Sequence, residues 1–212
     1  MPRFHLHHAP KTRSFRILWL LEELGADYAI ILHEIAQGTH KTPAFLALNP
    51  DGKLPVLEDH GPAGDWTGMV ICESAAICAY LGDALPSPLT PAIGTPERAI
   101  YATYLAYGAA AMEPALMDAA FPRAAPPRTG MAGWPDFANC VARVEAQIAT
   151  SGGPFLLGAT CTVPDIFIGS LLQWVVGWGM HTPSAAAAVY LGALDARPAL
   201  ARARAIDAPA PA

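Results

Sequence analysis

A proline-rich break at residues 86–91 divides this 212-residue sequence into two parts with different patterns. Pro86, Pro88 and Pro91 stand in the break, and proline neither continues a helix nor donates to a sheet. Strand and helix patterns alternate before the break, whereas no segment after it has a strong strand pattern. We therefore predict an α/β domain over residues 1–83, a linker over residues 84–94 and an all-α domain over residues 95–212.

The first part predicts the element order β-α-β, a loop, and then β-β-α. The first strand pattern surrounds Phe4 and Leu6, and the others cover residues 28–35, 54–57 and 69–72. A helix is expected over residues 14–24, where apolar residues form one face and Gly25 provides a stop. A short helix is expected around residues 42–48, and a longer one over residues 73–81.

The second part predicts helices over residues 96–120, 135–150, 163–178, 184–193 and 198–206. A stretch rich in proline and glycine at residues 122–133 separates the first two. The helix that begins at residue 163 is apolar on nearly every side, which predicts burial at the centre of the helical domain. Thr162 and Asp165 have the spacing of a capping box, a structural feature at the start of that helix.

Charge and composition narrow the range of partners. The formal charge is −5 and no run of Lys or Arg is present, which argues against nucleic acid as a partner. The longest apolar stretch, residues 166–180, is shorter than the ~20 residues of a membrane span. Near the N-terminus His5, His7 and His8 interrupt any export signal. We expect a cytoplasmic protein with no membrane partner.

The cysteines give no sign of a metal site. They show no CxxC spacing and have no companion histidines at the spacing of metal ligands, so reduced and mostly buried thiols are expected. The four cysteines are Cys72, Cys78, Cys140 and Cys161.

Three segments carry residues suited to chemistry. Residues 12–16 form a strand-to-helix turn, whose N–H groups and positive dipole end favour a thiolate. Residues 49–57 enter a strand through Pro55, which can leave the backbone of Leu54 open to an extended peptide. Glu73 and Ser74 open a helix and offer a carboxylate for an ammonium and a helix N-terminus for a carboxylate. Together they describe a site for a short peptide with a thiol, an amine and carboxylates.

Each of these segments also has a plain structural reading when taken alone. Ser14 suits a helix N-cap, Lys53 a solvated surface charge and Pro55 an ordinary turn, while Glu73 suits a helix start. The functional interpretation rests on the order and spacing of the three segments, together with the pattern of predicted strands and helices.

The chain resembles the cytosolic glutathione transferase superfamily over essentially its whole length. Residues 13–25 look like the first helix of bacterial members, and residues 49–57 and 73–77 like the glutathione-binding strand and helix. Residues 162–165 resemble the capping box of the family, and residues 197–200 its late helix. The resemblance implies a thioredoxin-like first domain of order βαβ-ββα and an all-helical second domain. It also implies a homodimer that uses glutathione as a co-substrate in detoxification.

The resemblance assigns the glutathione contacts residue by residue. It implies a cis peptide before Pro55 and backbone pairing of Leu54 with the cysteinyl part of glutathione. Glu73 and Ser74 would hold the γ-glutamyl end. The glycyl carboxylate would lie near Lys53 and His40.

The residue that activates the thiol differs among members of the family, which use tyrosine, serine or cysteine. Here the first strand ends without a tyrosine, and no cysteine lies near the turn, which argues against the dithiol-type subfamilies. Similarity to the serine type places Thr12 at the position of the serine hydroxyl, with Ser14 as the nearby alternative. Lowering a thiol pKa of ~8.5 by two units requires about 2.7 kcal/mol. One hydrogen bond to a charged group contributes roughly 1.5–3 kcal/mol, which is comparable with this free energy.

The expected activity is conjugation of the glutathione thiolate to small apolar electrophiles, and no metal is implied. Isomerase, peroxidase or dehalogenase chemistry on the same scaffold is an alternative, and so is a non-catalytic glutathione-binding or interaction protein. An apolar electrophile pocket is expected, although aromatic residues at helical spacing are more often core. The candidates for this pocket are Tyr104, Tyr107, Met112, Phe121, Trp174 and Trp178.

Overall fold

The computed structural model describes residues 1–122, 124, 128 and 130–208. Within them the chain divides into two compact units, of which the first joins Met1–Ser87 to the segment that begins at Ala196, and the second is Pro88–Asp195. Parts of the predicted break at residues 122–133, and the last residues of the predicted 95–212 domain, lie outside the described residues.

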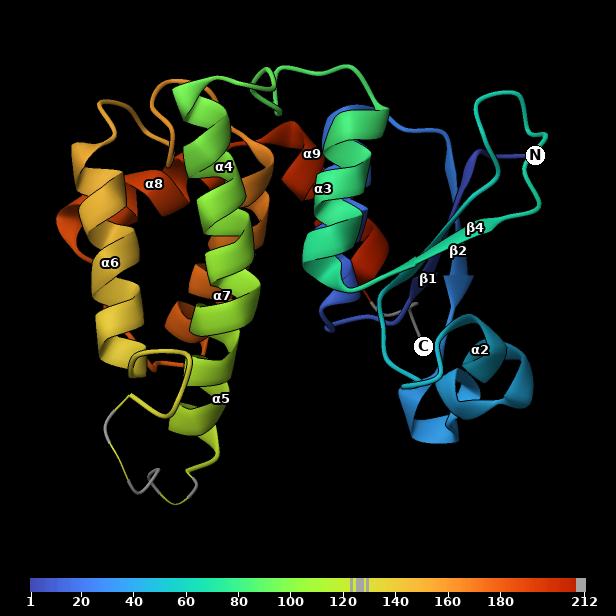
Figure 1. The fold of residues 1–212 in the computed structure, drawn as a ribbon, viewed down its shortest axis with the longest axis horizontal. Helices are drawn as coiled ribbons and strands as arrows, with labels where there is room; N and C mark the ends of the chain where they lie inside the picture. Colours follow the sequence, from blue (N-terminus) through green and yellow to red (C-terminus); the bar gives the residue numbers. More distant parts are fainter. Residues whose placement is uncertain (123, 125–127, 129, 209–212) are drawn as a thin grey trace. The chain divides into compact units, whose positions relative to one another are not determined.

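The first unit contains a mixed four-stranded sheet (Figure 1). Its strands β1 (Phe4–His8), β2 (Tyr28–Leu32), β3 (Val56–Asp59) and β4 (Met69–Cys72) are arranged in the order β2-β1-β3-β4. β1 pairs parallel with β2 and antiparallel with β3, and β3 pairs antiparallel with β4. This sheet confirms the predicted thioredoxin-like fold of the first domain.

The helices of this unit connect the strands and cover the sheet. They are α1 (Ser14–Leu24), α2 (Pro43–Leu48) and α3 (Ser74–Ala84), with the 3₁₀ turns η1 (Ile35–Gln37) and η2 (Thr39–Lys41) before α2. α1 ends as predicted, because Gly25 adopts the left-handed conformation with φ of 58°. The apolar face of α1, from Ile17 to Leu21, is fully buried and forms the core with Phe4 and Leu6 of β1.

Three predicted elements in this unit have different bounds in the structure. β2 ends at Leu32 rather than at residue 35. β3 covers Val56–Asp59 rather than residues 54–57, and it begins later because Pro55 has no N–H for a ladder. The predicted helix over residues 73–81 instead begins at Ser74 and runs through Gly82 to Ala84. Gly82 is buried within the helix, so packing outweighs its tendency to end one.

The second unit is helical, with α4 (Pro96–Tyr107), η3 (Gly108–Met112), α5 (Glu113–Ala120), α6 (Phe137–Thr150), α7 (Val163–Gly177) and α8 (Ala185–Asp195) (Figure 1). The helix predicted over residues 96–120 contains a wider π turn at η3. A Cβ atom at Gly108 would lie 2.6 Å from the Phe167 ring, so this glycine permits a close approach to α7. As predicted, α7 is the buried central helix.

The capping box at the start of α7 is confirmed. The Thr162 N–H and hydroxyl donate to Oδ2 of Asp165 at 2.7 and 2.8 Å. The Leu156 N–H donates to Oδ1 of the same carboxylate at 2.8 Å. Asp165 therefore ties the loop before α7 to the helix start.

The last helix, α9 (Pro198–Asp207), packs in the first unit, whereas the sequence predicted one helical domain from residue 95 onwards. Arg197 pairs with both carboxylate oxygens of Glu23, at 2.5 and 2.7 Å, and Arg202 pairs with Glu22 at 2.5 Å. Leu200 is fully buried. Helical periodicity does not reveal this placement, because it depends on acidic residues about 175 positions earlier in the chain.

In the part of the chain that the structure describes, none of the helices combines the length and apolarity needed to cross a membrane.

Candidate functional site

The register of the sheet brings the three predicted segments to one end of the first unit. His7 of β1 lies opposite Val56 of β3, and Val56 lies opposite Cys72 of β4. The end of β1, the start of β3 and the end of β4 therefore meet at the same end of the sheet. The turn into α1, the Leu54–Pro55 segment and the start of α3 leave from these three strand ends.

The segment before β3 presents an open backbone. The Leu54–Pro55 peptide is cis, as the resemblance implied. The buried Asn49 holds the preceding loop, since its amide donates to the Lys53 carbonyl at 2.9 Å and its Oδ1 accepts from the Asp51 N–H at 3.2 Å. Among the described residues, neither the N–H nor the C=O of Leu54 has a hydrogen-bond partner. An extended peptide can pair with both groups.

Glu73 stands at the start of α3 in an uncommon backbone conformation. Its φ of 68° and ψ of 123° are unusual for a residue other than glycine. Such a conformation costs of order 1–3 kcal/mol and is concentrated at functional sites. Glu73 is exposed and Ser74, the first residue of α3, is buried. The pair offers a solvent-facing carboxylate beside a helix N-terminus.

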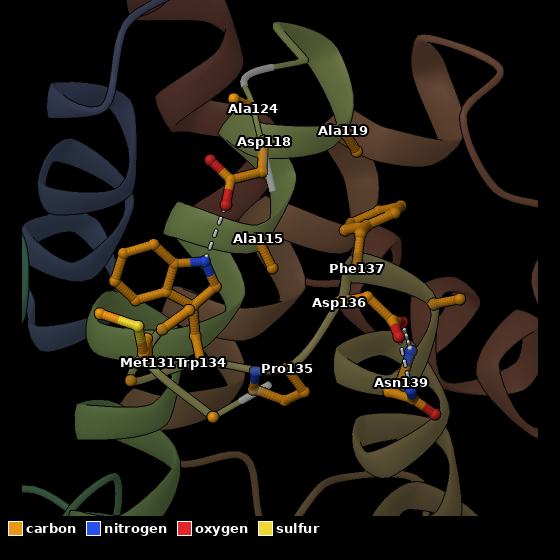
Figure 2. A pocket seen from close by; sticks show the side chains of 14 residues that line it. Ala115, Asp118, Ala119, Ala124, Met131, Trp134, Pro135, Asp136, Phe137 and Asn139 are labelled. Carbon is orange, nitrogen blue, oxygen red and sulfur yellow. Dashed lines mark hydrogen bonds between the residues drawn. The ribbon is translucent and has the colours of Figure 1, made fainter. Parts of the chain in front are cut away.

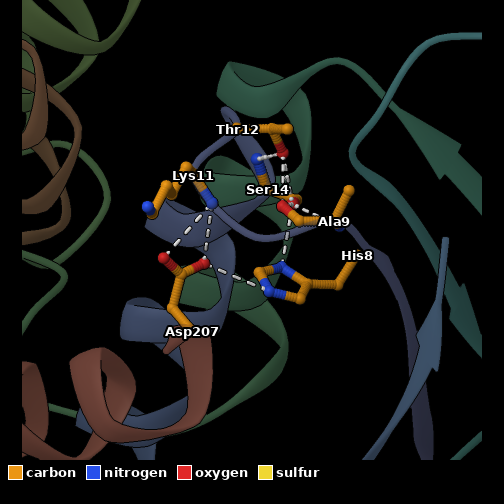
Figure 3. Close-up of polar contacts among 6 residues, drawn as sticks. All are labelled: His8, Ala9, Lys11, Thr12, Ser14 and Asp207. Carbon is orange, nitrogen blue, oxygen red and sulfur yellow. Dashed lines mark hydrogen bonds and ion pairs between the residues drawn. The ribbon is translucent and has the colours of Figure 1, made fainter. Parts of the chain in front are cut away.

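The two candidate hydroxyls at the α1 turn have different surroundings (Figure 3). The Ser14 hydroxyl is fully buried, 2.8 Å from Nδ1 of His8, and it accepts from the Ala9 N–H at 3.2 Å. Thr12 is half-buried, and its hydroxyl lies 2.8 Å both from the Ser14 hydroxyl and from the Ala9 carbonyl. Of the two, Thr12 is therefore the one open to a ligand.

Sequence reasoning missed two residues beside this turn, His8 and Asp207 (Figure 3). Nε2 of His8 lies 3.2 Å from Oδ1 of Asp207, the last residue of α9. The Asp207 carboxylate also accepts from the Lys11 N–H, at 3.2 Å for each oxygen. No local signal could have found Asp207, because 196 positions separate it from Lys11.

Lys53 and His40, the residues implied for the glycyl carboxylate, have solvent access. Lys53 is exposed, and His40 in η2 is half-buried. Nδ1 of His40 is buried and without a hydrogen-bond partner in the described part of the chain. Their contact with a ligand remains a prediction.

His7, His33 and Glu58 form a connected group of polar side chains near this site. Nδ1 of His7 is 2.9 Å from Nε2 of His33, and Nε2 of His7 is 2.9 Å from the Glu58 carboxylate. Burial and the neighbouring His7 and His40 lower the pKa of His33. Within the described residues, no three or more His, Cys, Asp or Glu side chains are placed to hold a metal ion.

The candidate residues for an electrophile pocket belong to the second unit. Tyr104, Tyr107 and Met112 are buried in its helical core, whereas Phe121 and Trp178 are 74% and 56% exposed. Trp174 and Trp178 stack with their ring centroids 5.6 Å apart. A role for any of them in binding an electrophile remains a prediction.

A cavity of about 1280 Å³ lies beside α5 and α6 in the second unit (Figure 2). Its lining includes Met131, Trp134 and Phe137, and the Trp134 indole N–H donates to the Asp118 carboxylate at 2.9 Å. None of the predicted pocket residues lines it.

Comparison with known proteins relates the first unit to one family. Residues 2–83 match the family model "Glutathione S-transferase, N-terminal domain". The disulfide-bond oxidoreductase YfcG of Escherichia coli is 35% identical over 78 residues, which are 37% of this chain and 36% of that protein. The chain spans about a third, or less, of the length of the curated relatives it matches.

Solved structures extend the likeness to the whole fold. A glutathione transferase homologue from Lodderomyces elongisporus, solved with two GSH per subunit, has a TM-score of 0.81 at 21% identity and covers 97% of this chain and 99% of that one. A glutathione transferase from Methylococcus capsulatus has a TM-score of 0.77 at 27% identity, covering 96% and 98%. The chain thus has the fold of the glutathione transferases, and its residues 2–83 match their N-terminal domain.

Proposed function

We propose that this chain is a bacterial member of the cytosolic glutathione transferase superfamily, of the type that uses a hydroxyl, and that its first unit binds glutathione. The observation that carries the proposal is the unpaired backbone of Leu54 before cis-Pro55, at the same sheet end as Glu73 and the α1 turn. Backbone pairing of this kind holds an extended peptide whatever its side chains.

The proposed pose of glutathione follows from the groups that lie at the three strand ends. Leu54 pairs with the cysteinyl backbone, and Glu73 and Ser74 hold the γ-glutamyl ammonium and carboxylate. The glycyl carboxylate lies towards Lys53 and His40. The sulfur then rests at the turn into α1, where the Thr12 hydroxyl donates to the thiolate.

The proposed reaction is transfer of the glutathione sulfur to a small apolar electrophile. The thiolate attacks an electrophilic carbon and a C–S bond forms, while the leaving group departs with its electron pair. A hydrogen bond from Thr12 together with the positive end of α1 supplies the roughly 2.7 kcal/mol that keeps the sulfur ionised near neutral pH. Tyr104, Tyr107, Met112, Phe121 and Trp178 are the residues proposed to contact the electrophile. The same proposal includes a homodimer with a detoxifying role in the cytoplasm.

A second candidate is glutathione-dependent disulfide chemistry. The observation that favours it is the similarity of residues in the first unit to the oxidoreductase YfcG. The described cysteine nearest the site in sequence is Cys72, and burial raises the pKa of its thiol, so this cysteine is poorly suited to be the nucleophile. Parallel assays with an electrophile panel and with a disulfide substrate separate the two activities.

The glutathione pose is tested at Glu73. Changing Glu73→Gln keeps the shape but removes the charge that pairs with the γ-glutamyl ammonium. We expect glutathione to bind about ten-fold more weakly, which corresponds to about 1.4 kcal/mol. The measurement is calorimetric titration, supported by retention on immobilised glutathione. Asp65→Asn, which changes an exposed carboxylate elsewhere in the first unit, is the matched control. Unchanged binding by the Glu73 variant would remove Glu73 from the site.

A further inference from the structure

We propose that His5 and His60 form a binding site for a divalent transition-metal cation, such as Zn²⁺ or Cu²⁺, at the end of the sheet opposite to the proposed peptide site. His5 lies near the start of β1, and His60 directly follows the last residue of β3. The peptide site instead begins where His7 lies opposite Val56. The inference goes beyond the proposed function, because it uses none of the residues assigned to glutathione.

The two histidine rings bring one nitrogen atom each close together. Nδ1 of His5 lies 3.2 Å from Nε2 of His60, and the ring centroids are 4.4 Å apart. At this distance one ring donates a proton to the other. Zn–N bonds of about 2.0–2.1 Å at a tetrahedral angle hold two nitrogen atoms roughly 3.3 Å apart. A cation can therefore take the place of the shared proton with little movement of either ring.

The backbone positions both histidines before a cation binds. The His60 N–H donates to the Arg3 carbonyl at 2.8 Å, and the Arg3 guanidinium makes two hydrogen bonds to the Asp59 carboxylate. The segment after β3 is therefore tied to the chain that leads into β1 and His5. Both histidines are half-buried, so their rings are held by neighbours yet reachable from solvent. Such preorganisation reduces the entropic cost of binding.

A carboxylate lies beside the pair and favours a cation. Glu58 is paired in register with His5, and one of its oxygens lies 2.9 Å from Nε2 of His7. A Cβ atom at Gly68 would lie 3.2 Å from Cε1 of His60 and 3.3 Å from the other Glu58 oxygen, so the glycine keeps space open between them. Two nitrogen ligands leave the remaining positions of the cation to water. The site is thus smaller than a group of three or more side chains, which the described residues do not form.

The neighbouring pair of His7 and His33 is not suited to a cation. Its nitrogen atoms are 2.9 Å apart, which is shorter than the tetrahedral span, and both residues are buried. Both rings also pack against Phe45, with centroid distances of 5.3 and 4.7 Å, which leaves little room for water ligands. Imidazole nitrogen suits Zn²⁺, Cu²⁺ and Ni²⁺, whereas Mg²⁺ and Ca²⁺ take oxygen ligands.

The test is calorimetric titration of Zn²⁺ into the full chain in the absence of glutathione, whose thiol would itself bind the metal. We expect saturation at one Zn²⁺ per chain and no saturable heat with Mg²⁺. His60→Phe keeps a flat ring but removes both ring nitrogens, and it should weaken Zn²⁺ binding at least ten-fold. His5→Gln should cause the same loss and serves if the first variant does not fold.

His33→Gln is the control variant, and its affinity for Zn²⁺ should stay within two-fold of the unaltered protein. Loss of Zn²⁺ binding in this variant but not in His60→Phe would place the metal at the neighbouring pair and overturn the inference. Absence of saturable Zn²⁺ binding to the unaltered protein would also overturn it.

Electron paramagnetic resonance of bound Cu²⁺ identifies the ligands directly. The measurement uses a Cys72→Ser background, because Cys72 is the half-buried cysteine and its thiol can react with Cu²⁺. We expect hyperfine splitting from two nitrogen ligands, reduced to one nitrogen by His60→Phe. A nitrogen splitting that is the same with and without His60→Phe would overturn the inference.

Discussion

Two hydroxyls stand at the start of α1, and their surroundings suit them to different roles. Ser14 is buried against His8 and Ala9, whereas Thr12 is half-buried at the open end of the same network. The extra methyl group and stiff χ1 of threonine restrict the directions in which its hydroxyl can donate. The Thr12 hydroxyl donates to the Ala9 carbonyl at 2.8 Å in the structure, so it must turn outwards to donate to a thiolate.

We therefore expect Thr12→Ala to lower turnover by ten-fold or more, while the affinity for glutathione changes little. In the proposed pose the lost hydrogen bond is made to the thiolate, whereas Leu54 and Glu73 hold the peptide. Steady-state kinetics with an electrophile panel measure turnover, and calorimetry measures affinity. Ser14→Ala is the comparison and should have the smaller effect, since Ser14 acts through Thr12. If Ser14→Ala abolishes turnover and Thr12→Ala does not, the assignment of the hydroxyl is reversed.

Sequence reasoning at the residue scale reached the groups that lie in short motifs. Leu54, Pro55, Glu73 and Ser74 could be proposed from the sequence because each stands beside a turn or helix signal, and the cis peptide expected before Pro55 is present. The positive φ of Glu73 carries no such signal, since glutamate rarely adopts it. Asp207 could not be found for another reason: its contact with His8 exists only after α9 folds back onto α1.

At the scale of elements, Asp59 joins the end of β3 to the start of β1 and to α3. Its buried carboxylate accepts from the Arg3 guanidinium at 3.0 and 2.8 Å, from the Tyr80 hydroxyl at 2.6 Å and from the Gly61 N–H at 2.7 Å. Burial alone would raise the pKa of Asp59, but these hydrogen bonds outweigh burial and hold that pKa below its ordinary value. The cluster therefore favours the folded chain while the carboxyl is ionised.

We expect Asp59→Asn to lower the free energy of unfolding by about 3 kcal/mol at pH 7, because it leaves Arg3 without its charged partner. The sign of the pH dependence follows from the lowered pKa. The contribution of Asp59 is present above the unfolded-state pKa of about 3.9 and is lost as the pH falls through the folded-state value. The difference between the two proteins should therefore shrink below about pH 4.

Urea unfolding at pH 7 and again near pH 3.5 measures both free energies. The exposed Asp65→Asn variant provides the matched control and should unfold like the unaltered protein at each pH. A difference that stays constant across this range would show that the Asp59 charge does not contribute to stability.

Most elements could be predicted from local signals, and the exceptions share a physical cause. The end of α1 matched because Gly25 provides the left-handed stop, and the start of α7 matched because Thr162 and Asp165 form a local cap. The π turn at η3 and the placement of α9 were not predicted. Both lie against packing partners that are distant in sequence, Phe167 beside Gly108 and Glu23 beside Arg197.

At the scale of the whole molecule, the fold persists where the sequence has diverged. The structure from Lodderomyces elongisporus superimposes over 97% of this chain at only 21% identity. The order of strands, the buried α7 and its cap need only hydrophobic patterning and a few turn residues, which many sequences satisfy. The proposed glutathione site sets more specific requirements, since it needs an open backbone at Leu54 and a carboxylate at Glu73 at the same end of one sheet.

Binding to the folded chain should also stabilise it. Glutathione at 100 times its dissociation constant would add about 2.7 kcal/mol to the free energy of unfolding. For a chain of this size the melting temperature should rise by roughly 5–10 °C, from about 2–4 °C per kcal/mol. This stabilisation should come from binding to the first unit, because the proposed peptide site lies at its strand ends.

The most direct test is calorimetric titration of reduced glutathione into the unaltered protein. The account predicts measurable heat, saturation at one glutathione per chain and ten-fold weaker binding in the Glu73→Gln variant. Absence of heat and of saturation at millimolar glutathione would contradict it.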